Sequence, residues 1–171
     1  KNVNSILPPP AQPTPMDPAL EHIMAMSQKP FQAFPGQDHK AHIDSHLNFM
    51  KSNMVQNSPS VMAALQKNIL ERISLMAQEQ IQLEFSSELL QAQQMQALLK
   101  INPQNPELIA QAQALTIKIN ARKAQLIADM MEEFMKEEKK ITSQFDNDPI
   151  AKLRARELDL QAQENARKKQ E

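Results

Sequence analysis

Residues 58–106 read SPSVMAALQKNILERISLMAQEQIQLEFSSELLQAQQMQALLKINPQNP, and this stretch decides the fold. It opens on Ser58-Pro59, a residue suited to cap a helix followed by one suited to its first position. No further proline or glycine occurs before Pro103. The spacing therefore predicts a helix of about 40 residues, on the order of 60 Å long at 1.5 Å per residue.

The same start signal occurs twice more along the chain. Asn105-Pro106 opens a second long helix that runs to about residue 144, and Asp148-Pro149 opens a last one. Because the connection between the two long helices is so short, we expect them to form an antiparallel hairpin.

The first third of the chain differs in composition. Eight prolines between positions 8 and 35 favour extended backbone, with room for one short helix capped by Asp17. Asp38 then caps a helix that carries three histidines. The predicted organisation is a Pro-rich extended lead with a short helix (1–36), a histidine-bearing helix (37–57), a long helical hairpin (58–147) and a barrel-type C-terminal helix (148–171).

The overall composition indicates an all-α structural protein with a thin core. The chain has 171 residues, one glycine, no cysteine, no tryptophan and 4% aromatic residues, with a net charge of −1. Without cysteine there is no disulfide, and no apolar run reaches the roughly 20 residues that a membrane span needs. With so little aromatic mass, the helices are expected to bury surface against other copies, as a ring or barrel.

A seven-residue repeat of apolar side chains runs along the first long helix, from Ile69 to Ala97. Its companion line, four residues on, is polar at Gln80, Ser87 and Gln94. A self-sufficient coiled coil would need both lines apolar, so this helix suits packing by its hairpin partner on one side and by a neighbouring subunit on the other. The positions expected to pack helices or subunits together are Ile69, Ile73, Met76, Leu83, Leu90, Leu115, Ile119, Leu126, Met130, Phe134, Leu153 and Leu160.

The clearest cluster of chemically active side chains is His39, His42 and His46, which share one stripe of a helix. Three imidazoles could in principle meet one metal ion. No fourth ligand and no cysteine accompany them, so we favour hydrogen-bonding histidines at an interface and expect no bound metal. A pH-sensitive contact is the alternative, since histidine titrates near neutrality.

No motif indicates catalysis. A single glycine cannot build a phosphate-binding loop, and no nucleophile motif surrounds the serines. The acidic pairs at 132–133 and 137–138 lie among lysines and are typical of a solvated helix face. We therefore expect no enzymatic activity, no catalytic residue and no cofactor.

The last segment contains basic residues that could face DNA, namely Lys152, Arg154 and Arg156. Acidic neighbours such as Glu157 balance them, so a single copy would attract DNA weakly. A ring of copies would multiply every charge.

Two stretches resemble the C-terminal crown and barrel region of tailed-bacteriophage portal proteins, the head–tail connectors. The first is DHKAHIDSHLNFMKSN (38–53) followed by NSPSVMAALQKNILERISLMAQ (57–78), a histidine-bearing helix that leads into a long helix. The second is FDNDPIAKLRARELDLQAQENARKK (145–169), with Asp-Pro before a helix of alternating basic and Glu-Leu or Asp-Leu residues. Together the resemblance covers about two-thirds of the chain.

The resemblance implies a structural virion protein that forms a homo-oligomeric ring of twelve copies at a capsid vertex. Such a ring takes part in DNA packaging, DNA ejection and head–tail joining. Its partners are double-stranded DNA, the capsid, and the terminase and head–tail adaptor, which bind parts of the subunit not in this chain. It is assembled in the host cytoplasm, and this region faces the capsid interior of the virion. We accordingly expect the chain to be a piece of a longer subunit.

Two other classes fit the same composition. A phage scaffolding or internal core protein would also be helical and rich in methionine and glutamine. A coiled-coil adaptor would dock a partner helix through a methionine-rich groove. Stoichiometry separates the three, because only the portal predicts a closed ring of fixed number.

Overall fold

The computed structural model describes residues 12–147 and 149–170, and every regular element in those ranges is an α-helix. The prediction of an all-α fold is confirmed. The predicted histidine-bearing helix is divided in two, and residues 1–11 of the predicted lead lie outside the described ranges, as does Asp148. The helices are α1 (Pro18–Met26), α2 (His39–Met50), α3 (Asn53–Gln56), α4 (Pro59–Glu84), α5 (Ser86–Ile101), α6 (Pro106–Asn147) and α7 (Pro149–Lys168).

The predicted capping residues begin their helices. The Oδ1 atoms of Asp17, Asp38 and Asn105 each accept a hydrogen bond from the backbone N–H three residues further on, at 2.9, 3.0 and 3.3 Å. Helix α4 begins at Pro59 as predicted, although Ser58 makes no side-chain capping bond. These short polar side chains satisfy backbone donors that the first helical turn leaves unpaired.

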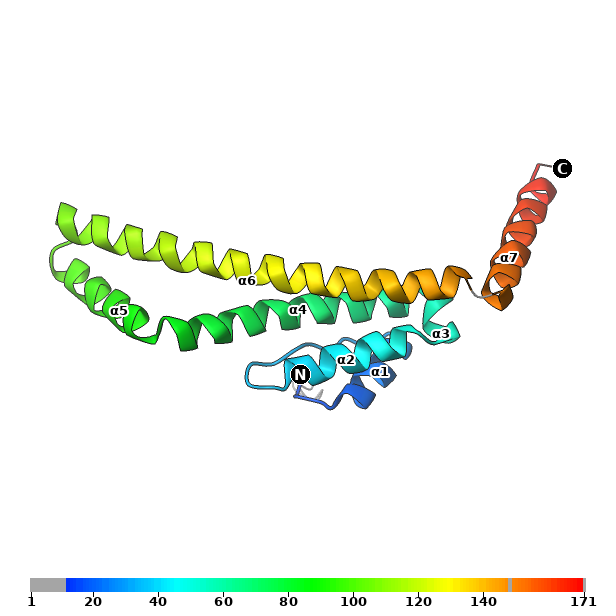
Figure 1. The fold of residues 1–171 in the computed structure, drawn as a ribbon, viewed down its shortest axis with the longest axis horizontal. Coiled ribbons are helices and arrows are strands. Elements are labelled where there is room, and N and C mark those ends of the chain that lie inside the picture. Colours follow the sequence, from blue (N-terminus) through cyan, green and yellow to red (C-terminus); the bar gives the residue numbers. More distant parts are fainter. Residues whose placement is uncertain (1–11, 148, 171) are drawn as a thin grey trace, which may run out of the picture.

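The molecule is elongated, as Figure 1 shows. Helix α6 lies alongside α5 and α4 and runs in the opposite direction, while α1 and α2 pack on α4. Helix α7 turns away at the far end of α6, and none of its described side chains is buried. No helix within the described ranges is both long enough and apolar enough to cross a membrane.

The hydrophobic core occupies only part of this length. The main cluster joins α1, α2, α3, α4 and α6, with Leu65 and Ile69 fully buried and Phe134 8% exposed. A smaller cluster continues along α4 and α6 around Ile81 and Leu126. Beyond it, α5 contains no buried residue. The far end of the molecule, made by α5 and the start of α6, is therefore an arm without a core of its own.

The first long helix has a break that the sequence analysis did not predict. Helix α4 ends at Glu84 and α5 begins at Ser86, because Phe85 adopts φ −116° and ψ 29°. Its half-buried side chain packs against the smaller cluster, and the two serines that follow are weaker helix formers than the surrounding residues. Packing of the aromatic ring and low local propensity together account for the interruption.

The seven-residue repeat in this helix does not stay on one face of the core. Ile69 is buried and Met76 half-buried, but Leu83 is 76% exposed and Leu90 56% exposed. The buried line instead advances every four residues from Val61 to Ile81, and so winds around α4. In a helix with 3.6 residues per turn, a seven-residue line and a four-residue line rotate in opposite directions, so they separate along the helix.

Candidate functional site

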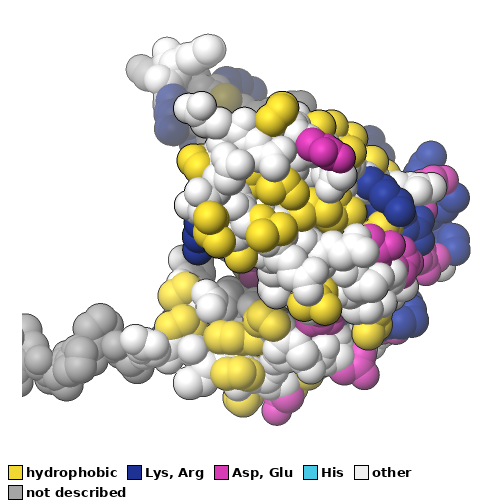
Figure 2. Space-filling model, turned by 90° about the vertical axis from the view of Figure 1, so that its left-hand side faces the viewer, with side chains coloured by type: hydrophobic (Ala, Val, Ile, Leu, Met, Phe, Trp, Pro, Cys, Tyr) yellow, Lys and Arg dark blue, Asp and Glu magenta, His cyan; other side chains and the backbone are white. Residues whose placement is uncertain are grey.

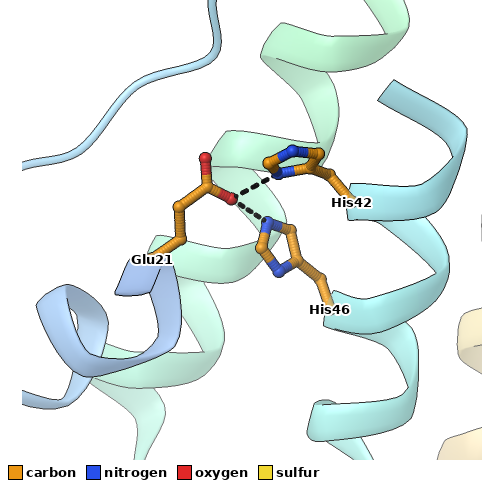
Figure 3. A group of neighbouring side chains, drawn as sticks. All are labelled: Glu21, His42 and His46. Atoms are coloured by element: carbon orange, nitrogen blue, oxygen red, sulfur yellow. Dashed lines mark hydrogen bonds and ion pairs between the residues drawn. The ribbon is translucent and has the colours of Figure 1, made fainter. Parts of the chain in front are cut away.

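The three histidines of α2 lie inside the chain, where they meet an acidic residue from another helix. His39, His42 and His46 are all buried. Figure 3 shows the carboxylate of Glu21, from α1, between two of them. Its Oε2 atom lies 2.9 Å from Nδ1 of His42 and 3.0 Å from Nε2 of His46. The sequence analysis singled out the three histidines as possible interface residues, whereas it missed Glu21, an acid on a short and mostly apolar helix.

Arg72 of α4 joins this group from the other side. Its side chain is fully buried, and it donates a short hydrogen bond to Oε1 of Glu21. Its Nε atom donates to Oδ1 of Asn68 at 2.8 Å, and Nη1 donates to Oε1 of Gln37 at 3.2 Å. One guanidinium thus connects α4 to α1 and to the segment that precedes α2.

His39 extends the network toward the surface. Its Nδ1 atom lies 3.2 Å from Nη1 of Arg72, and its Nε2 atom lies 3.2 Å from Oε1 of Glu79. Arginine can only donate, so Nδ1 must accept, and Nε2 carries the proton that is donated to Glu79. The same Glu79 oxygen accepts a hydrogen bond from the backbone N–H of Gly36 at 2.8 Å, which is the main reason that its pKa is lowered. The end of the Pro-rich lead is therefore docked on α4 of its own chain.

The fourth histidine, His22 of α1, completes the network. Its Nε2 atom lies 2.9 Å from Nδ1 of His46, and its ring stacks on Phe49 with 4.2 Å between centroids. Burial, reinforced by the neighbouring His46, lowers the pKa of His22 to about 4. His22 is therefore neutral at neutral pH.

The charges of this cluster are already balanced. Burial alone would raise the pKa of Glu21, but hydrogen bonds from His46 and His42, together with the charge of Arg72, lower it overall. Glu21 is thus an anion paired with the cation Arg72 inside the protein. A buried pair of this kind holds its elements in one arrangement, because removing either partner leaves an uncompensated charge.

The same residues were tested as a metal centre. Glu21, His42 and His46 each offer one ligand atom, and these atoms lie within 4.8 Å of one another, a donor set that zinc accepts. Arg72, however, already neutralises Glu21, so a divalent ion would leave two uncompensated positive charges in a buried site. We interpret the cluster of Glu21, His39, His42, His46 and Arg72, hereafter the histidine lock, as a hydrogen-bonded connection between α1, α2 and α4.

The second candidate site is the arm formed by α5 and the start of α6. No charged residue occurs in 89–99 or 108–117. Large apolar side chains are nevertheless exposed there, including Leu90 at 56%, Ile101 at 84% and Ile117 at 69%. Figure 2 looks onto this end of the molecule, where hydrophobic side chains gather and charged ones lie mainly to one side. Such a surface is typical of an interaction site.

The remaining predicted residues divide between the core and the surface. The α6 positions Leu126 and Phe134 are buried. Leu115, Ile119 and Met130 are half-buried against α4 and α5, and Ile73 lies in the main cluster. On α7, Leu153 and Leu160 are 62% and 57% exposed, and so are not covered within the chain. The possible DNA-facing residues Lys152, Arg154 and Arg156 are exposed on the same helix, on a different part of the fold from the histidine lock.

No protein-family model, curated protein or solved structure matches this chain. The functional interpretation therefore rests on the histidine lock, the arm and α7.

Proposed function

We propose that this chain is a structural, non-enzymatic assembly subunit: the capsid-interior part of a tailed-phage portal, which forms a closed ring through which DNA is packaged and ejected. The observation that carries this proposal is the exposed apolar surface of the arm. The arm exposes Leu90, Ile101 and Ile117, yet contributes no buried residue from α5. Apolar surface of this extent is stabilised when other copies cover it.

Helix α7 supports the same proposal by its two opposed apolar faces. At 100° per residue, Leu153 and Leu160 share one side, and Ala155, Leu158 and Ala162 lie on the opposite side. All five side chains are exposed. A helix with apolar residues on both sides and charged residues between them fits side-by-side packing between two like helices. This is the arrangement that a barrel of C-terminal helices requires.

The uncharged surface of the arm also suits a passage for DNA. Residues 89–99 and 108–117 carry no charge, and the glutamines between their apolar side chains are polar without attracting phosphate strongly. A lining that bound DNA tightly would slow its movement. The resemblance of residues 38–53, 57–78 and 145–169 to the portal crown and barrel region supports this proposal. The predicted partners, location in the virion and copy number follow from the same resemblance.

The direct test is electron microscopy of particles assembled from the full chain. The portal proposal predicts class averages that show a closed ring of about twelve copies with a central hole. Because the proposed contacts are apolar, the ring should persist when salt is raised to about 1 M, where the Debye length falls to about 3 Å. Open or heterogeneous oligomers would instead favour a scaffolding or core protein. A monomer that binds an added partner helix would favour an adaptor.

A further inference from the structure

Helix α6 carries a second apolar stripe, which lies on the side opposite α5 along the arm and reaches the main core cluster at Met131. Its positions alternate at spacings of four and three residues, as in a coiled-coil seam. None of these residues is buried, and all except the half-buried Met131 are exposed. The α6 outer stripe consists of Ala110, Ala114, Ile117, Ala121, Ala124, Ala128, Met131 and Met135.

The other side of the arm carries a stripe with larger apolar side chains, interrupted by the polar Ser87 and Gln94. It starts at the end of α4 and continues along α5 with the same alternating spacing. Leu83, Leu90 and Ile101 are its most prominent members, at 76%, 56% and 84% exposed. The α5 outer stripe consists of Leu83, Ser87, Leu90, Gln94, Ala97 and Ile101.

The two stripes face away from each other, one on each side of the arm. On α5, Leu89, Ala92 and Leu99 are half-buried toward α6, and Leu90 and Ala97 lie about half a turn away from them. On α6, Leu115 and Ile119 are half-buried toward α5 and lie about half a turn from the outer stripe. The arm is thus a two-helix layer with an apolar face on each side.

The two outer stripes are complementary in the size of their side chains, and they lie at the same level along the arm. One presents leucine and isoleucine, while the other is mostly alanine, so large side chains can fit over small ones. The ion pairs Arg122–Glu84 at 2.8 Å and Lys118–Glu88 at 4.0 Å fix which residues lie at the same level of the arm. By the same pairing, Leu90 is about level with Ile117, which puts two large exposed side chains, one from each stripe, side by side in a rotated neighbour.

We infer that the α5 outer stripe of one copy packs against the α6 outer stripe of the next copy, so that the arms join head to tail. A contact between two α6 stripes, or between two α5 stripes, would leave the other face of each arm open. A head-to-tail contact covers both faces, and it closes into a ring when the rotation between copies is correct. The absence of charge from 89–99 and 108–117 means that this contact desolvates no ion over most of its length.

The size of the contact favours a closed assembly over a dimer. The α5 outer stripe is about 27 Å long at 1.5 Å per residue, and a helix is about 10 Å wide. One contact therefore buries about 270 Å² on each partner, well below the roughly 800 Å² per partner of a stable pair. In a ring each copy makes two such contacts, and other elements such as α7 add to them. This inference deepens the proposed function, but it requires only self-association and not the portal role.

The test uses the absence of native cysteine. Single variants L90C and I117C are prepared in the full chain, assembled separately and as an equal mixture, and then oxidised. A disulfide forms only when Cβ atoms approach within about 4.5 Å, so cross-linking reports direct packing. The mixture should give a cross-linked dimer, and each variant alone should not. A114C and A121C, one turn to either side of Ile117, serve as alternative partners for L90C to determine the register.

The matched control is the pair Q96C and Q111C. Both positions are exposed on the same arm, but they are rotated by about 100° or more from the stripe centres. They should not cross-link in the mixture. Cross-linking of L90C with itself, or no cross-link between L90C and any of the three α6 variants in an assembled sample, would overturn the inference. A cross-link in an oligomer that is not a ring would uphold this contact and overturn the portal proposal. A ring without the cross-link would overturn this contact and leave the portal proposal standing.

Discussion

Replacing Arg72 with methionine removes the cation from the histidine lock. Arg72 and Glu21 are both fully buried, and in R72M the carboxylate of Glu21 would stay inside without its counter-ion. Breaking a buried ion pair in this way costs about 3–5 kcal/mol, a large share of the roughly 5–15 kcal/mol that stabilises a typical domain. Because the pair connects α1 to α4, the loss should appear first as release of α1 and the lead.

The assay is urea unfolding followed by far-UV circular dichroism, since the chain has no tryptophan or tyrosine to report by fluorescence. Hydrogen exchange of α1 measures the local release. E21Q/R72M removes the buried charge and should recover about 2 kcal/mol or more of the R72M loss.

The control R122M removes an exposed arginine that pairs with Glu84, and should hardly change the urea midpoint. Our interpretation of the histidine lock would be refuted if R72M proved as stable as the parent chain. It would be refuted equally if E21Q/R72M proved less stable than R72M alone.

Three further predictions follow from the same structure. The pKa of His22 is about 4 in the folded chain and about 6.5 when unfolded, so only the unfolded state binds its proton between these values. The free energy of unfolding should therefore fall by up to about 3 kcal/mol as pH drops from 6.5 to 4. In H22Q the urea midpoint should depend less on pH over this range. An unchanged pH dependence in H22Q would contradict the low pKa of His22. L65A removes a fully buried side chain and should lower the free energy of unfolding by about 2–5 kcal/mol. L83A changes a position that is 76% exposed and should lower it by under about 0.5 kcal/mol in the monomer. Urea unfolding measures both, and similar losses in the two variants would contradict the assigned burial. Excess Zn²⁺ should leave the melting temperature unchanged because the lock is already neutral, and a rise that H46N abolishes would show a metal site instead.

The sequence predicted the helices well because their starts are encoded locally. A capping side chain and a proline act within one turn, so Asp17, Asp38 and Asn105 could be read without knowledge of the fold. The break at Phe85 could not, since it depends on the ring reaching a cluster that forms only when α6 packs on α4. Likewise the heptad line predicted Ile69 as a packing residue, but not that the core would wind away from Leu83.

The histidine lock was predicted only in part, for a similar reason. The spacing of His42 and His46 places them on one helix face, which is local information. Their partners Glu21 and Arg72 lie 21 and 30 residues away from His42 along the chain, on other helices, and no sequence pattern connects them. The outer stripes of the arm, by contrast, are periodic in sequence, but only the structure separates them from the inner stripes.

The central claim is that other copies of this chain cover the apolar surface left open by the arm and by α7. Native mass spectrometry of the full chain over a range of concentrations tests this most directly. The account predicts one dominant closed species of fixed copy number, about twelve, with few intermediates, because each copy gains its full buried surface only when the ring closes. A monomer at all concentrations, or a continuous distribution of oligomers without a preferred number, would contradict it.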